Sequence, residues 1–131
     1  MNAPTKSDLQ AAGYRVSVNI ADAVVARCAA DVKAAYLLAH VTEADITASS
    51  GNDSIGDAWR TLTVLRMMQD NEFATRVGGE KKRLSYGDHL TDNRQAKTRA
   101  AMALHNLNAD HPATGEVRDI CEVWFRTQLM L

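Results

Sequence analysis

The chain has 131 residues, and its 15 Lys and Arg against 16 Asp and Glu give a formal net charge of −1. This length suits one domain with one core, and the near-neutral charge argues against a free-standing DNA-binding protein. No stretch approaches about 18 uninterrupted apolar residues and the first residues do not resemble a secretory signal, so we expect a cytoplasmic protein without membrane contact.

Apolar residues recur at helical spacing along most of the chain, which predicts an all-α bundle of about five to six helices in a single domain, residues 1–131. The first is a short helix over residues 7–12, ended by Gly13 in the left-handed conformation. After an extended connector, Asn19 is expected to cap a long helix over residues 20–40. The apolar stripe of this helix consists of Ile20, Val24, Cys28, Val32 and Tyr36.

A second long helix is expected over residues 55–74. It follows a helical turn that opens at Thr42 and a loop, residues 49–54, that ends in the capping residue Ser54. Its buried stripe is expected to contain Ile55, Trp59, Leu62, Leu65 and either Met68 or Phe73. The two long helices should pack through Val24, Cys28, Val32, Trp59 and Leu62. We expect Cys28, like Cys121 near the C-terminus, to be a small buried hydrophobe.

Two further helices are expected in the last third of the chain. Asp92 is predicted to cap a helix over residues 93–108, and Thr114 a helix over residues 116–129. The inward side chains of the first are Ala96, Ala100, Ala103, Leu104 and Leu107. Those of the second are Val117, Ile120, Cys121, Trp124 and Phe125.

Residues 76–92, RVGGEKKRLSYGDHLTD, are the most informative stretch. Residues 76–99 hold seven Lys and Arg against three Asp and Glu, a local charge of +4 that leaves −5 for the rest. Gly78 and Gly79 let the chain leave a helix sharply, and Leu84 and Tyr86 alternate with polar residues as in a short strand or hairpin arm. We interpret the stretch as a protein-binding arm, with a solvated loop as the alternative. The candidate contact residues are Arg76, Lys81, Lys82, Arg83, Leu84 and Tyr86.

The C-terminal sequence, EVWFRTQLML, places five large apolar residues among the last eight. Chain ends are normally polar and frayed. The core can take Trp124 and its neighbours, but less readily the final three residues. We therefore expect residues 126–131 to be a docking tip that inserts Leu129, Met130 and Leu131 into a partner.

Sites of chemistry are not expected. His40, His89, His105 and His111 show no metal-ligand spacing, and the glycines before Lys81 lack the spacing of a phosphate loop. No serine or cysteine lies in a recognisable nucleophile turn. The sequence therefore predicts no metal, no cofactor and no enzymatic activity.

Three segments, NIADAVVARCAADVKAAYLL, LRMMQDNEFATR and VGGEKKRLSYGD, together with the following helix pair, resemble the small helical head-completion, or head-tail connector, proteins of tailed bacteriophages. The apolar C-terminal tip and the helix after Pro112 depart from the more familiar members. The resemblance implies a ring of about a dozen copies, formed by one repeated contact between subunits. This ring would join the portal to the neck or tail of the virion after assembly in the host cytoplasm. Double-stranded DNA would pass through the lumen as non-specific cargo.

A different class of function stays open beside this one. A small helical DNA-binding regulator, similar to helix-turn-helix proteins or antitoxins, would need a recognition helix with base-reading side chains. The start of the helix over residues 93–108 contains a weak version of such a set. Its members are Asn93, Arg94, Gln95 and Arg99, and such a regulator would use Arg94, Lys97 and Arg99 together with the basic loop.

Overall fold

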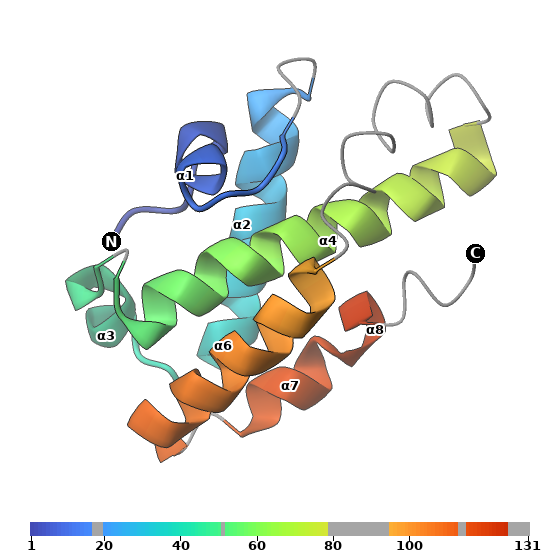
Figure 1. The fold of residues 1–131 in the computed structure, drawn as a ribbon. Coiled ribbons are helices and arrows are strands. Elements are labelled where there is room, and N and C mark those ends of the chain that lie inside the picture. Colours follow the sequence, from blue (N-terminus) through green and yellow to red (C-terminus); the bar gives the residue numbers. More distant parts are fainter. Residues whose placement is uncertain (17–19, 51, 79–94, 113–114, 126–131) are drawn as a thin grey trace.

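The structure, a computed structural model, describes residues 1–16, 20–50, 52–78, 95–112 and 115–125, and of residues 70–78 it describes the backbone only. Within these ranges every regular element is a helix, so the predicted all-α class is confirmed (Figure 1). The helices are α1 (Lys6–Ala11), α2 (Asp22–Leu38), α3 (Glu43–Ala48), α4 (Ser54–Gly78), α6 (Ala96–Asp110), α7 (Glu116–Ile120) and α8 (Glu122–Phe125).

Helix α4 is the central element. It passes between α2 and α6, which make the most extensive contacts with it (Figure 1). Its buried residues lie on more than one face and include two threonines, Thr61 and Thr63, which are 1% and 0% exposed. Each threonine hydroxyl donates to a carbonyl oxygen one turn earlier, that of Asp57 at 2.9 Å and that of Trp59 at 2.7 Å, so neither polar group is left unsatisfied.

The main core is built around one large anchor, Trp59, which is 2% exposed. Its indole Nε1 donates to the carbonyl oxygen of Ala29 in α2 at 2.9 Å, and its ring meets Tyr36 edge-on at 6.3 Å between centroids. The Tyr36 hydroxyl in turn donates to the carbonyl oxygen of Ile55 at 2.9 Å. The predicted packing of the two long helices through Val32, Trp59 and Leu62 is therefore confirmed.

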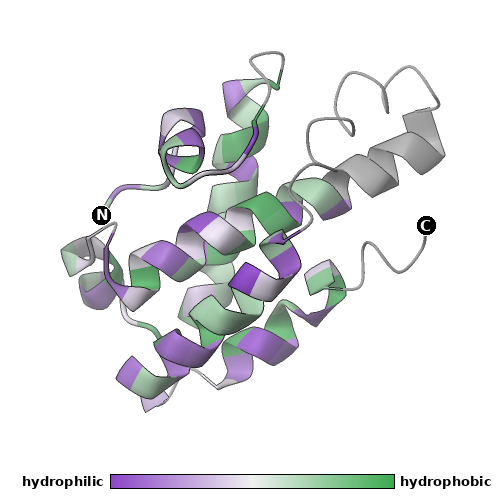
Figure 2. Cartoon of the chain, viewed as in Figure 1, coloured by the Kyte–Doolittle hydropathy of each residue, from purple (hydrophilic) through white to green (hydrophobic). Residues whose placement is uncertain are grey.

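A second, separate cluster of buried residues lies beside the main core and shares no residue with it. Cys28, predicted to join the same interface as Trp59, belongs to this satellite cluster, and Val24 packs against it only partly buried. The division arises because the segment before α2 folds back over α2 and α4 and brings its own apolar side chains. The satellite cluster consists of Leu9, Tyr14, Val16, Ile20, Val25, Cys28, Val64, Met67, Met68 and Ala96. Figure 2 shows hydrophobic and hydrophilic residues alternating along the helices, as inner and outer faces require.

Several predicted helix ends are confirmed. Gly13 follows α1 with a φ of 96°, the left-handed conformation predicted for it. Thr42 caps α3, because its hydroxyl accepts from the amide of Asp45 at 3.1 Å. The cap of α1 was not predicted: Thr5 caps this helix in a capping box with Asp8, and the helix begins at Lys6, one residue before the predicted start.

Other predicted ends are wrong. Asp53, not Ser54, caps α4, since its Oδ1 accepts from the Gly56 amide at 2.9 Å while Ser54 is the first helical residue. Helix α2 spans 22–38 rather than 20–40, with Ala21 at its N-cap position, and the predicted cap Asn19 lies outside the described residues. Helix α6 has Gln95 at its N-cap and runs two residues beyond the predicted end, although all five of its predicted inward residues are buried. The predicted caps at positions 92 and 114 lie outside the described residues.

The predicted C-terminal helix over residues 116–129 is broken at Cys121 into α7 and α8. The two pieces pack on different partners, because α7 contacts α2 and α6 whereas α8 contacts α4. A single straight helix could not make both sets of contacts. Val117, Cys121, Trp124 and Phe125 are buried as predicted, and Ile120 is partly buried.

His40 follows α2 with a φ of 69°, a left-handed conformation that a residue with a Cβ adopts at a cost. The turn is a Schellman motif, in which the amides of His40 and Val41 donate to the carbonyl oxygens of Leu37 at 3.2 Å and Tyr36 at 3.0 Å. His40→Gly is therefore expected to raise the free energy of unfolding by about 0.5–1 kcal/mol, measured by urea denaturation. His40→Ala keeps a Cβ and serves as the control, and an equal gain in both variants would contradict the explanation.

Candidate interaction surfaces

The first residues of the predicted arm belong to a helix. Helix α4 continues to Gly78, so Arg76 belongs to its last turns rather than to a loop. The helix extends because no breaker precedes the glycine pair. The other predicted arm residues, Lys81, Lys82, Arg83, Leu84 and Tyr86, lie outside the described residues, as does the short strand proposed for them.

The two segments predicted to bind partners depart from the same side of the bundle. The C-terminal part of α4 projects beyond the other described helices (Figure 1). Ala96, the first residue of α6 and next to the point where the described chain resumes, packs with Met67 and Met68 of α4 in the satellite cluster. Phe125, the last described residue, ends α8, which also packs against α4.

The first part of the apolar C-terminal sequence belongs to the core. Trp124 and Phe125 are 8% and 5% exposed. The Arg118 guanidinium lies 3.8 Å from the centre of the Phe125 ring, and its Nη1 is 2.6 Å from an oxygen of Glu122. The proposed docking residues Leu129, Met130 and Leu131 lie outside the described residues.

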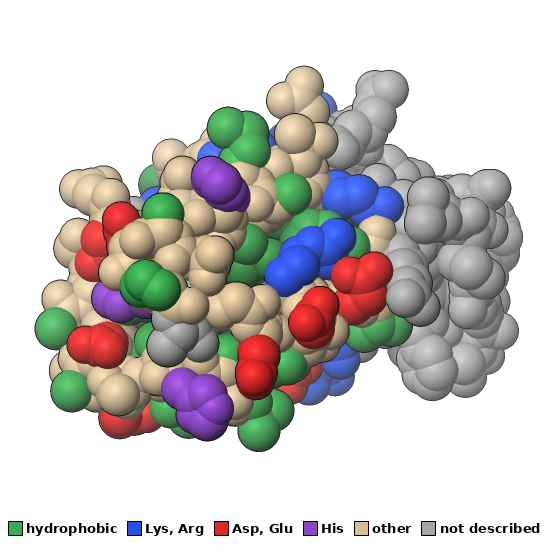
Figure 3. Space-filling view, turned by 90° about the horizontal axis from the view of Figure 1, so that it is seen from below, with side chains coloured by type: hydrophobic (Ala, Val, Ile, Leu, Met, Phe, Trp, Pro, Cys, Tyr) green, Lys and Arg blue, Asp and Glu red, His purple; other side chains and the backbone are tan. Residues whose placement is uncertain are grey.

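A polar hollow of 480 Å³ lies at the other end of α4, where the start of α4 meets the end of α6. Three carboxylates, from Asp53, Asp57 and Asp110, share this hollow with the guanidinium of Arg60. Arg60 Nη2 is 3.9 Å from Asp57 Oδ1, a long and weak ion pair. Figure 3, a view from below, shows acidic side chains scattered over this face, with most of the basic ones toward the upper and right parts of the view.

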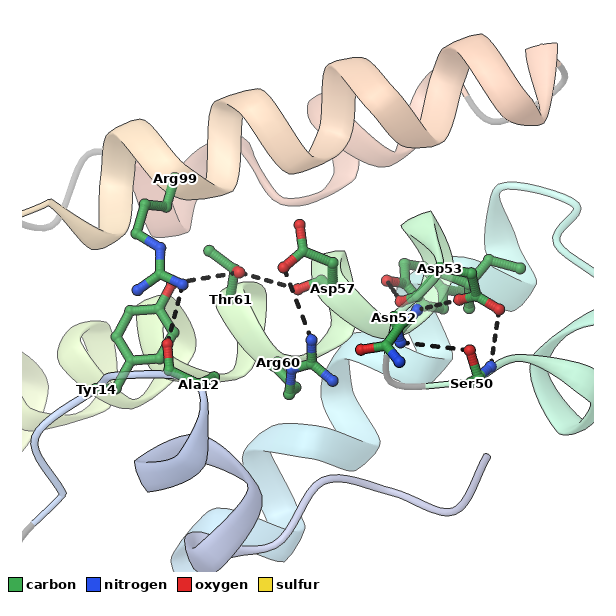
Figure 4. Close-up of polar contacts among 12 residues, drawn as sticks. Ala12, Tyr14, Ser50, Asn52, Asp53, Asp57, Arg60, Thr61 and Arg99 are labelled. Atoms are coloured by element: carbon green, nitrogen blue, oxygen red, sulfur yellow. Dashed lines mark hydrogen bonds and ion pairs between the residues drawn. The ribbon is translucent and has the colours of Figure 1, made fainter.

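Arg99 is occupied inside the fold, which bears on the DNA-binding interpretation. Its guanidinium lies 4.2 Å from the centre of the Tyr14 ring, and Nη2 donates to the carbonyl oxygen of Ala12 at 3.1 Å (Figure 4). The Tyr14 hydroxyl donates to Thr61 Oγ1 at 3.3 Å, and burial raises the pKa of Tyr14. Arg99 therefore connects α6 to the N-terminal segment and is not presented for reading bases. The sequence contains no signal for this contact, because it joins distant parts of the chain.

The buried cysteines match their predicted role. Cys28 and Cys121 are both 0% exposed. Burial raises the pKa of the Cys121 thiol to about 12, so this thiol is a poor nucleophile near neutral pH.

The described part of the chain contains no group of three or more His, Cys, Asp or Glu side chains placed to hold a metal ion. His40, His105 and His111 lie within it and His89 lies outside. Among the described helices, none combines the length and apolar character needed to cross a membrane. Comparison with protein-family models, curated proteins and solved structures finds no match for this chain.

Proposed function

We propose that this protein is a structural subunit of a tailed-bacteriophage particle, a head-tail connector that forms a ring between the portal and the neck or tail. The observation that carries the proposal is that both segments predicted to bind partners depart from the side of the bundle where α4 projects. Two such segments extend the contact area of a small domain. Departure from one side of the bundle lets both act on neighbouring subunits.

The distribution of charge supports a head-to-tail contact. Subunits of a ring meet through two different surfaces, so one surface must complement the other. The basic segment follows the C-terminal end of α4, whereas Asp53, Asp57 and Asp110 gather at its N-terminal end. Charges so arranged favour one register over another more than they add affinity.

The net charge of −1 supports a lumen through which DNA slides. Each phosphate neutralised by Lys or Arg releases counterions and strengthens the grip on the duplex, so a densely basic channel would retain DNA. The engagement of Arg99 with Tyr14 and Ala12 also leaves the alternative, a DNA-binding regulator, with fewer free basic side chains.

Sedimentation velocity and negative-stain electron microscopy of the purified protein, alone and with portal-bearing heads, test the proposal. Closed rings, or density added at the portal vertex, are expected. A monomer or dimer that binds duplex DNA with a steep salt dependence and never attaches to heads would instead identify the regulator.

Deleting residues 129–131 is expected to leave the melting temperature within about 2 °C of the parent while reducing attachment to portal-bearing heads, because a docking tip contributes little to the core. The measurements are thermal unfolding and co-sedimentation with heads. Phe125→Ala is the matched control, since Phe125 is buried and its loss should lower the melting temperature by roughly 10 °C. A comparable drop in the melting temperature of the deletion variant would show that residues 129–131 belong to the core and would contradict the docking role.

A further inference from the structure

The segment before α2 covers a groove between α2 and α4. We call residues 5–16, which comprise α1 and the chain that follows it, the N-terminal strap. Leu9, Tyr14 and Val16 are its buried apolar side chains, at 0%, 5% and 6% exposure. They fill the groove lined by Val25, Cys28, Val64, Met67 and Met68.

Besides this apolar packing, the strap begins with a short helix and a surface ion pair, and the chain ahead of it is held separately, because the Met1 ammonium donates to the Ile46 carbonyl oxygen of α3 at 3.2 Å. Helix α1 has only six residues, too short to be stable without packing. Its ion pair to α2, from Lys6 to Asp22 at 3.6 Å, is a surface contact because the Asp22 side chain is 91% exposed. The satellite cluster under the strap shares no residue with the main core. Residues 5–16 contribute no side chain to the main core, so they can leave the groove while Met1, ahead of them, stays packed against that core.

Arg99 supplies a polar connection between α6 and the strap. Its guanidinium covers one face of the Tyr14 ring at 4.2 Å and donates at 3.1 Å to the Ala12 carbonyl oxygen. The Tyr14 hydroxyl also donates a hydrogen bond to Thr61 Oγ1 of α4 at 3.3 Å (Figure 4). Tyr14 is thus held between α6 and α4, and Arg99 belongs to the first turn of α6.

We propose that the strap is a conformational device, which opens from its groove as a unit while the main core stays folded, with Arg99 as the latch that holds it shut. Local opening of this kind is expected where a segment packs in a cluster of its own, apart from the main core. Because the latch lies on the first turn of α6, a shift of that turn releases the strap. The device does not depend on ring assembly.

Two buried cysteines make the opening measurable. Cys28 lies beneath the strap in the satellite cluster, whereas Cys121 lies in the main core. Reaction of the native protein with iodoacetamide, followed by peptide mass spectrometry, gives one labelling rate for each. Local opening predicts that Cys28 reacts faster than Cys121. It also predicts that low urea concentrations accelerate Cys28 labelling less than Cys121 labelling, because opening the strap exposes only the satellite cluster whereas reaching Cys121 requires the main core to unfold.

The latch is tested with Arg99→Ala, which should raise the Cys28 labelling rate roughly tenfold and leave that of Cys121 unchanged, since it removes a ring stack and a charged hydrogen bond. Lys97→Ala, on the same turn of α6, is the matched control and should change neither rate. Arg99→Lys keeps the charge without the planar group and should give an intermediate rate. Amide hydrogen exchange in α1 should rank the proteins in the same order: fastest in Arg99→Ala, intermediate in Arg99→Lys, and slowest in the parent and in Lys97→Ala.

Equal labelling rates with equal urea dependence for the two cysteines in the parent protein would show that the strap opens only on global unfolding and would overturn the proposal. So would an Arg99→Ala variant that accelerates both cysteines equally, or neither. If Arg99→Ala does not fold, the parent protein and Arg99→Lys still decide the question by the same two criteria.

Discussion

Trp59→Ala is expected to lower the free energy of unfolding by about 3–5 kcal/mol, the largest single-residue effect in the main core. The indole is 2% exposed, meets Tyr36 edge-on and donates to the Ala29 carbonyl oxygen at 2.9 Å. Removing it leaves both a large cavity and an acceptor in α2 without its donor. Urea denaturation followed by circular dichroism measures the loss.

Met102→Ala is a suitable control for Trp59→Ala, because Met102 is a large apolar residue of α6 that is 63% exposed. Its truncation should change the free energy of unfolding by no more than about 0.5 kcal/mol. A loss below about 1 kcal/mol for Trp59→Ala would place the indole at the surface and contradict the assignment of the main core.

Leu84→Asp combined with Tyr86→Asp is expected to abolish assembly into rings or onto heads in a subunit that still folds. If the two apolar side chains of the arm bury themselves in the next subunit or a neck protein, two carboxylates there would be desolvated without partners. Circular dichroism and thermal unfolding check the fold, and sedimentation velocity with negative-stain microscopy checks assembly.

Lys81→Ala with Lys82→Ala is the matched comparison for the double aspartate variant. Surface ion pairs contribute about 0–1 kcal/mol each, so this variant should assemble somewhat more weakly, and mainly at raised salt. Normal assembly of the double aspartate variant would mean that the predicted arm is a solvated loop, and the proposed function would lose its principal support from the sequence.

The long helices could be predicted because their buried stripes follow helical spacing. Val32 and Tyr36 of α2 and Trp59 and Leu62 of α4 were predicted inward and are at most 2% exposed. The two agree because burial of apolar side chains stabilises the fold, and a helix can bury them together only if they recur at helical spacing.

Helix ends and breaks were harder to predict because tertiary contacts decide them. His40 ends α2 in a left-handed conformation that glycine usually marks. The break at Cys121 interrupts an apolar pattern that continues without a gap, since α7 and α8 pack on different helices. No pattern in the sequence predicts the left-handed residue at position 40 or the break at Cys121.

The candidate interaction surfaces could be predicted only as segments. Their charge and apolar content are visible in the sequence, whereas their contacts depend on partners. Arg99 shows how composition alone can mislead. As a basic side chain near a helix start it was considered for reading DNA bases, whereas in the structure its guanidinium stacks on Tyr14. The composition of a helix turn does not reveal which distant residue folds back over it.

The continuity of α4 has a consequence for distances across the molecule. Its 25 residues are joined by one hydrogen-bonded ladder from Ser54 to Gly78, which corresponds to about 37 Å at the rise of an α-helix. The two ends of the molecule are thus separated by a rod rather than by a hinge or a linker. Helix α4 acts as a ruler, and any assembly that uses both ends inherits its length as a spacing.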